Sequence, residues 1–224
     1  MHDPALPLRI AILPVTPFQQ NCTILWCVVT RKAVVIDPGG DVDDIMAAIE
    51  ELKAAPQAKI EVEKIWLTHG HIDHVGGVAE LKERLGGIPV EGPHKLDEPL
   101  MQRVETQAKS MGVEGVRNAM SDRWLEEGQT VGIGKLTFQL FHCPGHSPGS
   151  IVYYNEAGRF AVVGDVLFQN SVGRTDLPGG DHQALISAIR TKLLPLGDDI
   201  NFICGHGAPS SFGRERKMNP FLQD

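Results

Sequence analysis

The 224-residue sequence has few of the features that place a chain outside the cytoplasm or in a membrane. Its four cysteines, Cys22, Cys27, Cys143 and Cys204, have no CxxC spacing, which argues against a structural zinc knuckle and gives no case for disulfides. No apolar run approaches the roughly 18 residues of a membrane helix, and no basic segment leads into an apolar one at the N-terminus. We therefore expect a cytoplasmic protein with free thiols and no membrane partner.

An excess of basic residues is also missing. The chain has 21 Lys and Arg against 28 Asp and Glu, which gives a net charge of −7. A protein that binds the phosphate backbone generally needs the opposite sign, so nucleic acid is disfavoured as a partner. The hydrophobic content of 42% is enough for a sizeable core. Because no linker or short repeat interrupts the chain, the sequence predicts a single domain over residues 1–224.

The most informative stretch is Thr68-His69-Gly70-His71-Ile72-Asp73-His74. It places three imidazoles and one carboxylate within six residues, directly after an apolar run at 65–67 that is typical of a buried strand. Neutral imidazole binds Zn, Fe, Ni and Cu, and a carboxylate adds a hard ligand that suits Mn, Fe or Zn. The stretch therefore predicts a metal site and leaves the metal open. A His-rich polar turn without a metal is the alternative.

The first half of the chain is expected to begin as an antiparallel meander. Its predicted strands are Leu8–Val15, Asn21–Thr30 and Lys32–Ile36, and an amphipathic helix over 41–55 follows. Strand Ile60–Leu67 then delivers the His cluster, and helix Val75–Leu85 leaves it. A site between the end of a strand and the start of a helix is a recurrent α/β arrangement.

The second half is predicted to return to β structure after a helical region. The expected elements are a short strand at 88–90, a helix over Leu96–Met111, strands at 129–131, Leu136–His142, Ile151–Tyr154 and Phe160–Val163, a last helix over Asp181–Leu194 and a final strand Ile200–Cys204. Strands and helices thus alternate in each half, which favours an α/β fold.

The pattern His69-x-His71-x-Asp73-His74 resembles the signature of the metallo-β-lactamase superfamily. His146 in the segment 143–149, Asp165 in 163–165 and His206 in 204–207 match the remaining ligand positions of that family in order and context. The resemblance implies an αββα sandwich, in which two mixed β-sheets are flanked by helices and the ligands lie on loops at one edge of the packed sheets.

The same resemblance implies a centre of two divalent metal ions, Zn and/or Fe, with Mn possible. His69, His71 and His146 are expected at one ion, Asp73, His74 and His206 at the second, and Asp165 between the two. A hydroxide held between the ions would then be the nucleophile, and no Ser, Cys or Lys nucleophile is needed. Asp73 and Asp165 are the expected catalytic carboxylates, with Asp73 orienting the hydroxide.

Two residues near the ligands have competing interpretations. Asp37 follows a strand, and its carboxylate could accept an imidazole N–H or could cap the helix that begins near Asp41. Cys143 lies three residues before His146, where a small buried residue at a strand end is favoured over a nucleophile or a ligand.

The segments 164–168 and 171–176 resemble the glyoxalase II branch of the family and the related persulfide dioxygenases, which act on glutathione derivatives. Arg174 is therefore a candidate contact for glutathione, and an internal salt bridge with Asp176 is the alternative. Ala208 stands where long glyoxalase II enzymes carry a Tyr, and their C-terminal helical domain is not expected here. The chain resembles the short bacterial type, with Arg214, Arg216 and Lys217 in a solvated tail.

The resemblance implies hydrolysis of a glutathione thioester such as S-D-lactoylglutathione to D-lactate and glutathione, a step of methylglyoxal detoxification. The enzymatic rival is a persulfide dioxygenase, with one Fe(II) held by His69, His146 and Asp165 and glutathione persulfide as substrate. A rival of another class is a non-catalytic protein whose metal only holds loops together. A monomer or a weak homo-oligomer is expected.

Overall fold

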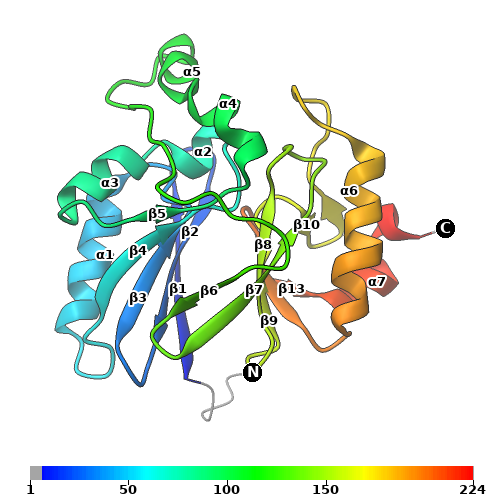
Figure 1. Cartoon of the computed structure of the whole chain (residues 1–224), viewed down its shortest axis with the longest axis horizontal. Helices are drawn as coiled ribbons and strands as arrows, with labels where there is room; N and C mark the ends of the chain where they lie inside the picture. Colours follow the sequence, from blue (N-terminus) through cyan, green and yellow to red (C-terminus); the bar gives the residue numbers. More distant parts are fainter. Residues whose placement is uncertain (1–6, 224) are drawn as a thin grey trace.

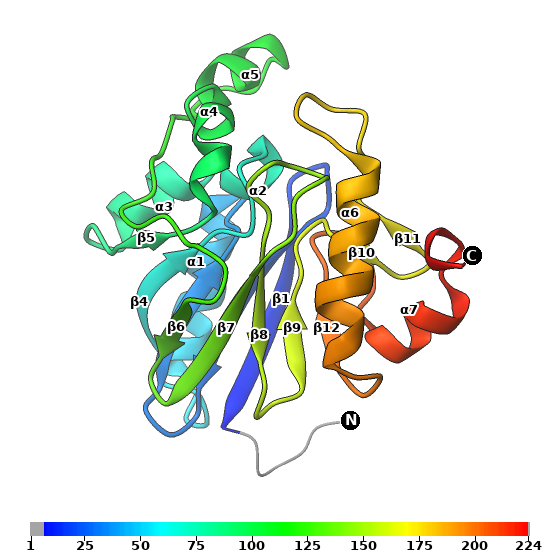
Figure 2. The same cartoon turned by 45° about the vertical axis from the view of Figure 1, so that its right-hand side comes forward.

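Two β-sheets packed face to face form the centre of the structure, and helices cover the outer face of each sheet (Figure 1). A computed structural model describes residues 7–223 of the chain. The arrangement is the αββα sandwich expected from the sequence. Viewed from the side, α6 (His182–Ala188) crosses the outer face of the second sheet (Figure 2).

The first sheet has five strands in the order β1-β2-β3-β4-β5. The strands are β1 (Leu8–Val15), β2 (Gln20–Cys27), β3 (Lys32–Ile36), β4 (Glu61–Trp66) and β5 (Val90–Glu91). The first three strands pair antiparallel, as the predicted meander requires, and β4 and β5 then join in parallel. Residues 28–30, predicted as the end of the second strand, are not in a strand.

The second sheet has six strands in the order β13-β12-β9-β8-β7-β6. They are β6 (Thr130–Ile133), β7 (Leu136–His142), β8 (Ile151–Asn155), β9 (Phe160–Val162), β12 (Asn201–Ile203) and β13 (Ser210–Ser211). A separate two-stranded hairpin, β10 (Leu167–Phe168) and β11 (Ser171–Val172), follows β9. The sequence pattern predicted neither this hairpin nor β13, because strands of two residues show no alternation.

Shorter segments replace three of the predicted helices. The helices are α1 (Val42–Ala54), α2 (Ile72–Val75), α3 (Val78–Arg84), η1 (Lys95–Asp97), α4 (Glu98–Met101), α5 (Val104–Ser110), α6, the π-helical turn η2 (Ile189–Leu193), η3 (Leu194–Leu196), α7 (Phe212–Met218) and η4 (Pro220–Leu222). None of the helices within residues 7–223 is both long and apolar enough to span a bilayer.

Two expectations about these helices were wrong. Gly76 and Gly77 separate the short α2, which carries Asp73 and His74, from α3, so the predicted helix Val75–Leu85 begins only at Val78. The segment expected as a solvated tail instead forms α7, so the helix over Asp181–Leu194 is not the last one. Arg214 and Arg216 both lie in α7 and make hydrogen bonds to other parts of the fold.

Three apolar clusters fill the layers between these elements. Because successive side chains of a strand point to opposite faces of the sheet, alternate residues of one strand belong to different clusters. In β3, Ala33 and Val35 face α1 and the outer cluster of the first sheet, whereas Val34 and Ile36 face the second sheet. The third cluster lies between the second sheet and helices α6 and α7.

A buried aromatic group joins the two sheets. The Trp66 ring of β4 stacks on Tyr153 of β8 with centroids 5.1 Å apart, and its edge meets Phe138 of β7 at 5.3 Å. The Tyr153 hydroxyl donates a hydrogen bond of 2.7 Å to the carbonyl of Leu67, directly before the His cluster. The packing of the two sheets therefore also holds the chain that enters the cluster.

We expect Trp66→Ala to lower the free energy of unfolding by about 3–5 kcal/mol, because it opens a cavity between the sheets that the surrounding side chains cannot fill. Val29→Ala is the control, since Val29 is 60% exposed and its loss should change stability by less than about 0.5 kcal/mol. Urea unfolding followed by circular dichroism measures both. Equal stability of the two variants would contradict this account of the inter-sheet core.

Candidate metal centre

Segments that follow four strands bring the expected ligands to one edge of the sandwich. His69 and His71 follow β4, and Asp73 and His74 lie in α2. His146 follows β7, Asp165 follows β9, and His206 follows β12. Because β3 and β4 are parallel in one sheet, and β7, β9 and β12 run in one direction in the other, their carboxyl ends meet at this edge.

His69, His71 and His146 form a first cluster. The Nε2 atom of His146 lies 3.2 Å from Nε2 of His69 and 2.9 Å from Nδ1 of His71. Burial, reinforced by the neighbouring imidazoles, lowers the pKa of His69 well below its ordinary value and that of His71 to about 4. The rings of His69 and His71 are therefore neutral at neutral pH, and their lone pairs are available to a cation.

Asp73, His74 and His206 form a second cluster. Oδ2 of Asp73 lies 3.1 Å from Nε2 of His206 and 3.8 Å from Nε2 of His74. Burial opposes ionisation of Asp73, but the nearby imidazoles of His74 and His206 hold its pKa below the ordinary value. Asp73 is therefore a carboxylate over the physiological pH range.

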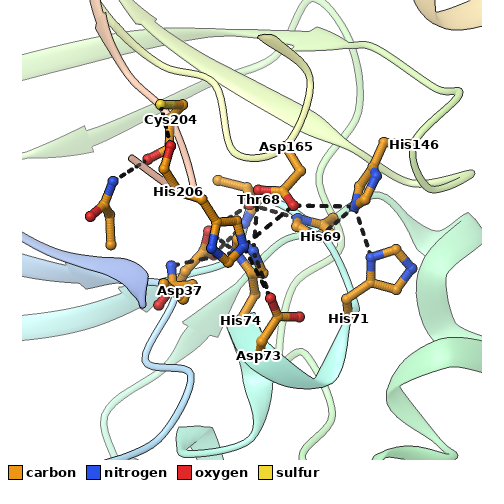
Figure 3. Close-up of polar contacts among 12 residues, drawn as sticks. Asp37, Thr68, His69, His71, Asp73, His74, His146, Asp165, Cys204 and His206 are labelled. Atoms are coloured by element: carbon orange, nitrogen blue, oxygen red, sulfur yellow. Dashed lines mark hydrogen bonds and ion pairs between the residues drawn. The ribbon is translucent and has the colours of Figure 1, made fainter. Parts of the chain in front are cut away.

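Asp165 lies between the two clusters (Figure 3). Its Oδ2 is 3.5 Å from Nε2 of His146 in the first cluster and 3.6 Å from Nε2 of His206 in the second. Its Oδ1 is 3.3 Å from Nε2 of His74. Although burial opposes ionisation, the imidazole of His74, followed by those of His146 and His206, lowers the pKa of Asp165. One carboxylate thus reaches ligand atoms of both clusters.

Two buried atoms at the centre fit a cation. Nε2 of His74 and Oδ1 of Asp165 are both buried and have no hydrogen-bond partner within residues 7–223, although they face each other at 3.3 Å. An unpaired buried polar atom is costly, and nearly all such atoms in native proteins have a partner. A metal ion coordinated by both atoms would satisfy them, so these residues fit the expected ions.

The second ring nitrogen of four of the imidazoles has a hydrogen-bond partner on the chain. The pairs are His69 Nδ1 with Thr68 Oγ1 at 3.0 Å, His74 Nδ1 with Asp37 Oδ2 at 2.9 Å, His146 Nδ1 with the Arg174 carbonyl at 2.9 Å, and His206 Nδ1 with the Phe18 carbonyl at 3.1 Å. Such partners fix the tautomer and the ring orientation of metal-binding histidines. In each of these four rings, Nε2 is the nitrogen turned toward the centre.

Asp37 supports both clusters. It accepts hydrogen bonds from the Thr68 amide at 2.7 Å and the Thr68 hydroxyl at 2.6 Å, besides its contact with His74. Of the two interpretations of Asp37, the structure places its carboxylate against an imidazole and not at the start of α1. Although Asp37, His69 and His74 also lie close enough together to form a cluster, Asp37 faces the Nδ1 side of His74, away from Asp165.

Asp97 was missed by the sequence analysis. It is fully buried and accepts hydrogen bonds from the Gly70 amide at 2.8 Å, the Ser147 hydroxyl at 2.8 Å and the Gly149 amide at 2.5 Å. These donors belong to the two loops that carry His69, His71 and His146, so one carboxylate ties both loops together. Asp97 lies in a segment predicted as plain helix, and no motif surrounds it that could have revealed this contact.

Gly205 permits the close approach of the second sheet to the centre. A Cβ atom at this position would lie 2.0 Å from Oδ1 of Asp165 and 2.6 Å from Cε1 of His74. Neither atom can retreat without disturbing the cluster, so a side chain at this position is excluded. The glycine before His206 is therefore required by packing.

A cavity of about 680 Å³ opens over both clusters. Besides His71, Asp73, His146, Asp165 and His206, its lining comprises Phe18, Ile72, Gln107, Met111, Phe168, Gln169, Ser171, Val172, Arg174, Leu177, Gly207 and Ala208. Both readings of Arg174 have support, since its guanidinium pairs with Asp176 at 2.6 and 2.8 Å and the residue also lines the cavity.

Cys143 lies outside this cavity, as a buried residue after β7. Burial raises the pKa of its thiol to about 12. At pH 8 only about one Cys143 in 10,000 is then a thiolate, so we expect a thiol reagent to leave it unmodified in the folded protein and to label it after denaturation. Peptide mass spectrometry distinguishes the sites, and rapid labelling of native Cys143 would contradict its assignment as an inert core residue.

The sequence profile described as Metallo-beta-lactamase superfamily matches residues 15–206. The hydroxyacylglutathione hydrolase GloC of Haemophilus influenzae is 42% identical over 216 residues, which cover 96% of this chain and 98% of that relative. The crystal structure of BLEG-1 B3 metallo-beta-lactamase superposes with a TM-score of 0.85 at 34% identity, covering 96% of this chain and 100% of that one. TTHA1623 in a di-iron-bound form superposes with a TM-score of 0.82 at 35% identity, covering 95% and 100%. The chain therefore belongs to the metallo-β-lactamase superfamily of metallo-hydrolases.

Proposed function

We propose that the chain hydrolyses glutathione thioesters such as S-D-lactoylglutathione, with D-lactate and glutathione as products. The observation that carries the proposal is the position of Asp165, between two complete ligand clusters at the floor of a substrate-sized cavity. The name of the Haemophilus influenzae relative supports the substrate class. The reaction class itself follows from the family.

Two divalent ions are proposed to bind here, one at His69, His71 and His146 and the other at Asp73, His74 and His206, with Asp165 shared by both. Five imidazoles and two carboxylates form a donor set that suits Zn or Fe. When bound, such ions supply Lewis acidity and lower the pKa of water toward about 7, which provides a nucleophile at neutral pH.

The chain's own residues orient this chemistry. Asp73 is ionised and lines the cavity, so its carboxylate can accept a hydrogen bond from the attacking water and direct it at the thioester carbon. The rings of His69 and His71 are neutral donors, and four of the five imidazole rings are oriented by the contacts described above. Because a thiolate is a good leaving group, no dedicated general acid is needed.

Arg174 is proposed to contact a carboxylate of glutathione. Its guanidinium is 62% exposed and is paired with Asp176 on the surface, where ion pairs are weak and screened. A substrate carboxylate can therefore replace Asp176 at little cost. The backbone of Arg174 has a different role from its side chain, since the carbonyl of Arg174 accepts a hydrogen bond from His146. A side-chain substitution at 174 should thus affect substrate binding and leave the metal centre in place.

The metal-loaded protein should cleave S-D-lactoylglutathione, measured as release of free thiol, and the metal-free protein should not. Three parallel assays separate the rivals: oxygen uptake with glutathione persulfide, opening of a β-lactam, and thermal unfolding with and without metal. Oxygen uptake without thiol release would establish the persulfide dioxygenase. Loss of the fold on metal removal, with no substrate turned over, would favour a structural metal.

Asp165→Ala and His206→Ala form a graded test of the ligand assignment. Wild type should carry about two ions per chain when metal is not limiting. Asp165→Ala should lose affinity at both sites by about 10–100-fold or more, whereas His206→Ala should empty mainly the second site. Metal analysis after gel filtration measures both. Asp176→Ala is the control, since its exposed carboxylate pairs with Arg174 and with none of the ligands. An Asp165→Ala variant that kept both ions would disprove the assignment.

A further inference from the structure

The β10–β11 hairpin forms one wall of the cavity. Phe168, Gln169, Ser171 and Val172 all line it, and the Phe168 ring lies 6.3 Å from the ring of His206. Only two residue pairs join the strands of this hairpin, and it belongs to neither large sheet. A hairpin of this size is not stable alone, so contacts from elsewhere in the fold must hold this wall in place.

Helix α7 and Asn219, the residue that follows it, provide these contacts, and α7 lies beside the hairpin in Figure 2. Oε2 of Glu215 accepts a hydrogen bond of 2.7 Å from the amide of Asn170, at the tip of the hairpin. The Nδ2 group of Asn219 donates to the carbonyl of Ser171 at 2.9 Å and is 3.4 Å from that of Phe168. Both strands of the hairpin are therefore bound through their backbone to two side chains at the end of the chain.

These two side chains are themselves fixed. Glu215 and Asn219 are both fully buried and lie 3.0 Å apart between Oε2 and Nδ2. Glu215 also accepts hydrogen bonds from the Ser210 hydroxyl and from Arg214 at 2.7 Å, and Arg214 reaches the Asn170 side chain at 2.9 Å. A buried carboxylate with this many donors is rigid, and loss of one partner leaves unpaired buried groups.

We propose that Glu215 and Asn219 are positioning residues that set the β10–β11 wall, and that Phe168 on this wall contacts the substrate and contributes to its selection. The inference rests on the proposed thioester hydrolysis for its kinetic test. Within residues 7–223, neither Glu215 nor Asn219 makes a hydrogen bond or an ion pair with a proposed metal ligand, so the hairpin is their connection to the cavity. Helix α7 thus shapes the cavity from a segment that carries no catalytic group.

Glu215→Gln should raise KM for S-D-lactoylglutathione by about 10-fold, roughly the effect of one lost hydrogen bond to a charged group, and change kcat by less than about 2-fold. Asn219→Ala should act in the same direction, and Phe168→Ala should also raise KM. Phe168→Ala combined with Glu215→Gln should cost less than the sum of the single changes, because both act through one contact. Metal content should stay at the wild-type level in all four.

Arg216→Gln is the matched control on the same helix. Its guanidinium binds Asp198 at 2.8 Å and the Leu194 carbonyl, and it makes no contact with the hairpin. We expect this variant to lose stability with KM unchanged. If Glu215→Gln and Arg216→Gln have the same kinetics at matched stability, or if kcat and metal content fall together in Glu215→Gln, the proposal is wrong.

Amide hydrogen exchange provides a readout that needs no substrate. In Glu215→Gln, the amides of residues 168–172 should exchange at least about 10-fold faster than in wild type, while those of β8 and β9 keep their protection. Unchanged exchange in the hairpin would overturn the proposal even if the enzyme were active. If the wild-type protein cleaved no thioester, the proposed function would be wrong. The exchange rates would then still test whether Glu215 and Asn219 position the hairpin.

Discussion

The hydrogen bonds of Asp37 are the interaction on which the geometry of the centre depends most. The carboxylate accepts hydrogen bonds from the amide and the hydroxyl of Thr68 and contacts Nδ1 of His74, so it acts on both clusters at once. His74 is held directly, and His69 is held through the Thr68 hydroxyl. Because a carboxylate in a buried site forms strong hydrogen bonds, this one group fixes the direction of two imidazoles whose Nε2 atoms would otherwise turn away from the centre.

The centre also needs the two sheets to keep their relative position. One sheet supplies the loop 67–74 and the other supplies His146, Asp165 and His206, so each cluster combines ligands from both sheets. Stacking of Trp66 on Tyr153 holds the sheets together, and the Tyr153 hydroxyl holds the carbonyl that precedes the His cluster. The buried Asp97 provides a second connection between the sheets, because it binds one loop from each of them. The geometry of the ligands therefore depends on the packing of the two sheets.

Sequence patterns could predict the elements and ligands whose signal is local. Strand β7 at Leu136–His142 alternates buried and exposed side chains, and the His cluster combines ligand types at close spacing, so both were predictable. Asp97 and Glu215 were not predictable, because their partners are distant in the sequence. Asp97 contacts Gly70 and Gly149, which are 27 and 52 positions away, and Glu215 contacts Asn170, which is 45 positions away. Helix α7 has only seven residues, and four of its side chains are charged. Such a composition predicts a solvated segment, and the contacts of these side chains cannot be read from the sequence.

The structure separates the groups that hold the metal from those that shape the cavity. Every proposed ligand follows a strand of the two large sheets or lies in α2. The hairpin wall instead depends on Glu215 of α7 and on Asn219, the residue that follows this helix, and no strand of either large sheet pairs with it. We therefore expect substitutions of Glu215 or Asn219 to act first on the hairpin and on Phe168. A fold built in this way can keep one hydrolytic centre while the recognition of the substrate changes from one relative to another, which is consistent with a hydroxyacylglutathione hydrolase and a metallo-beta-lactamase by name among the relatives of this chain.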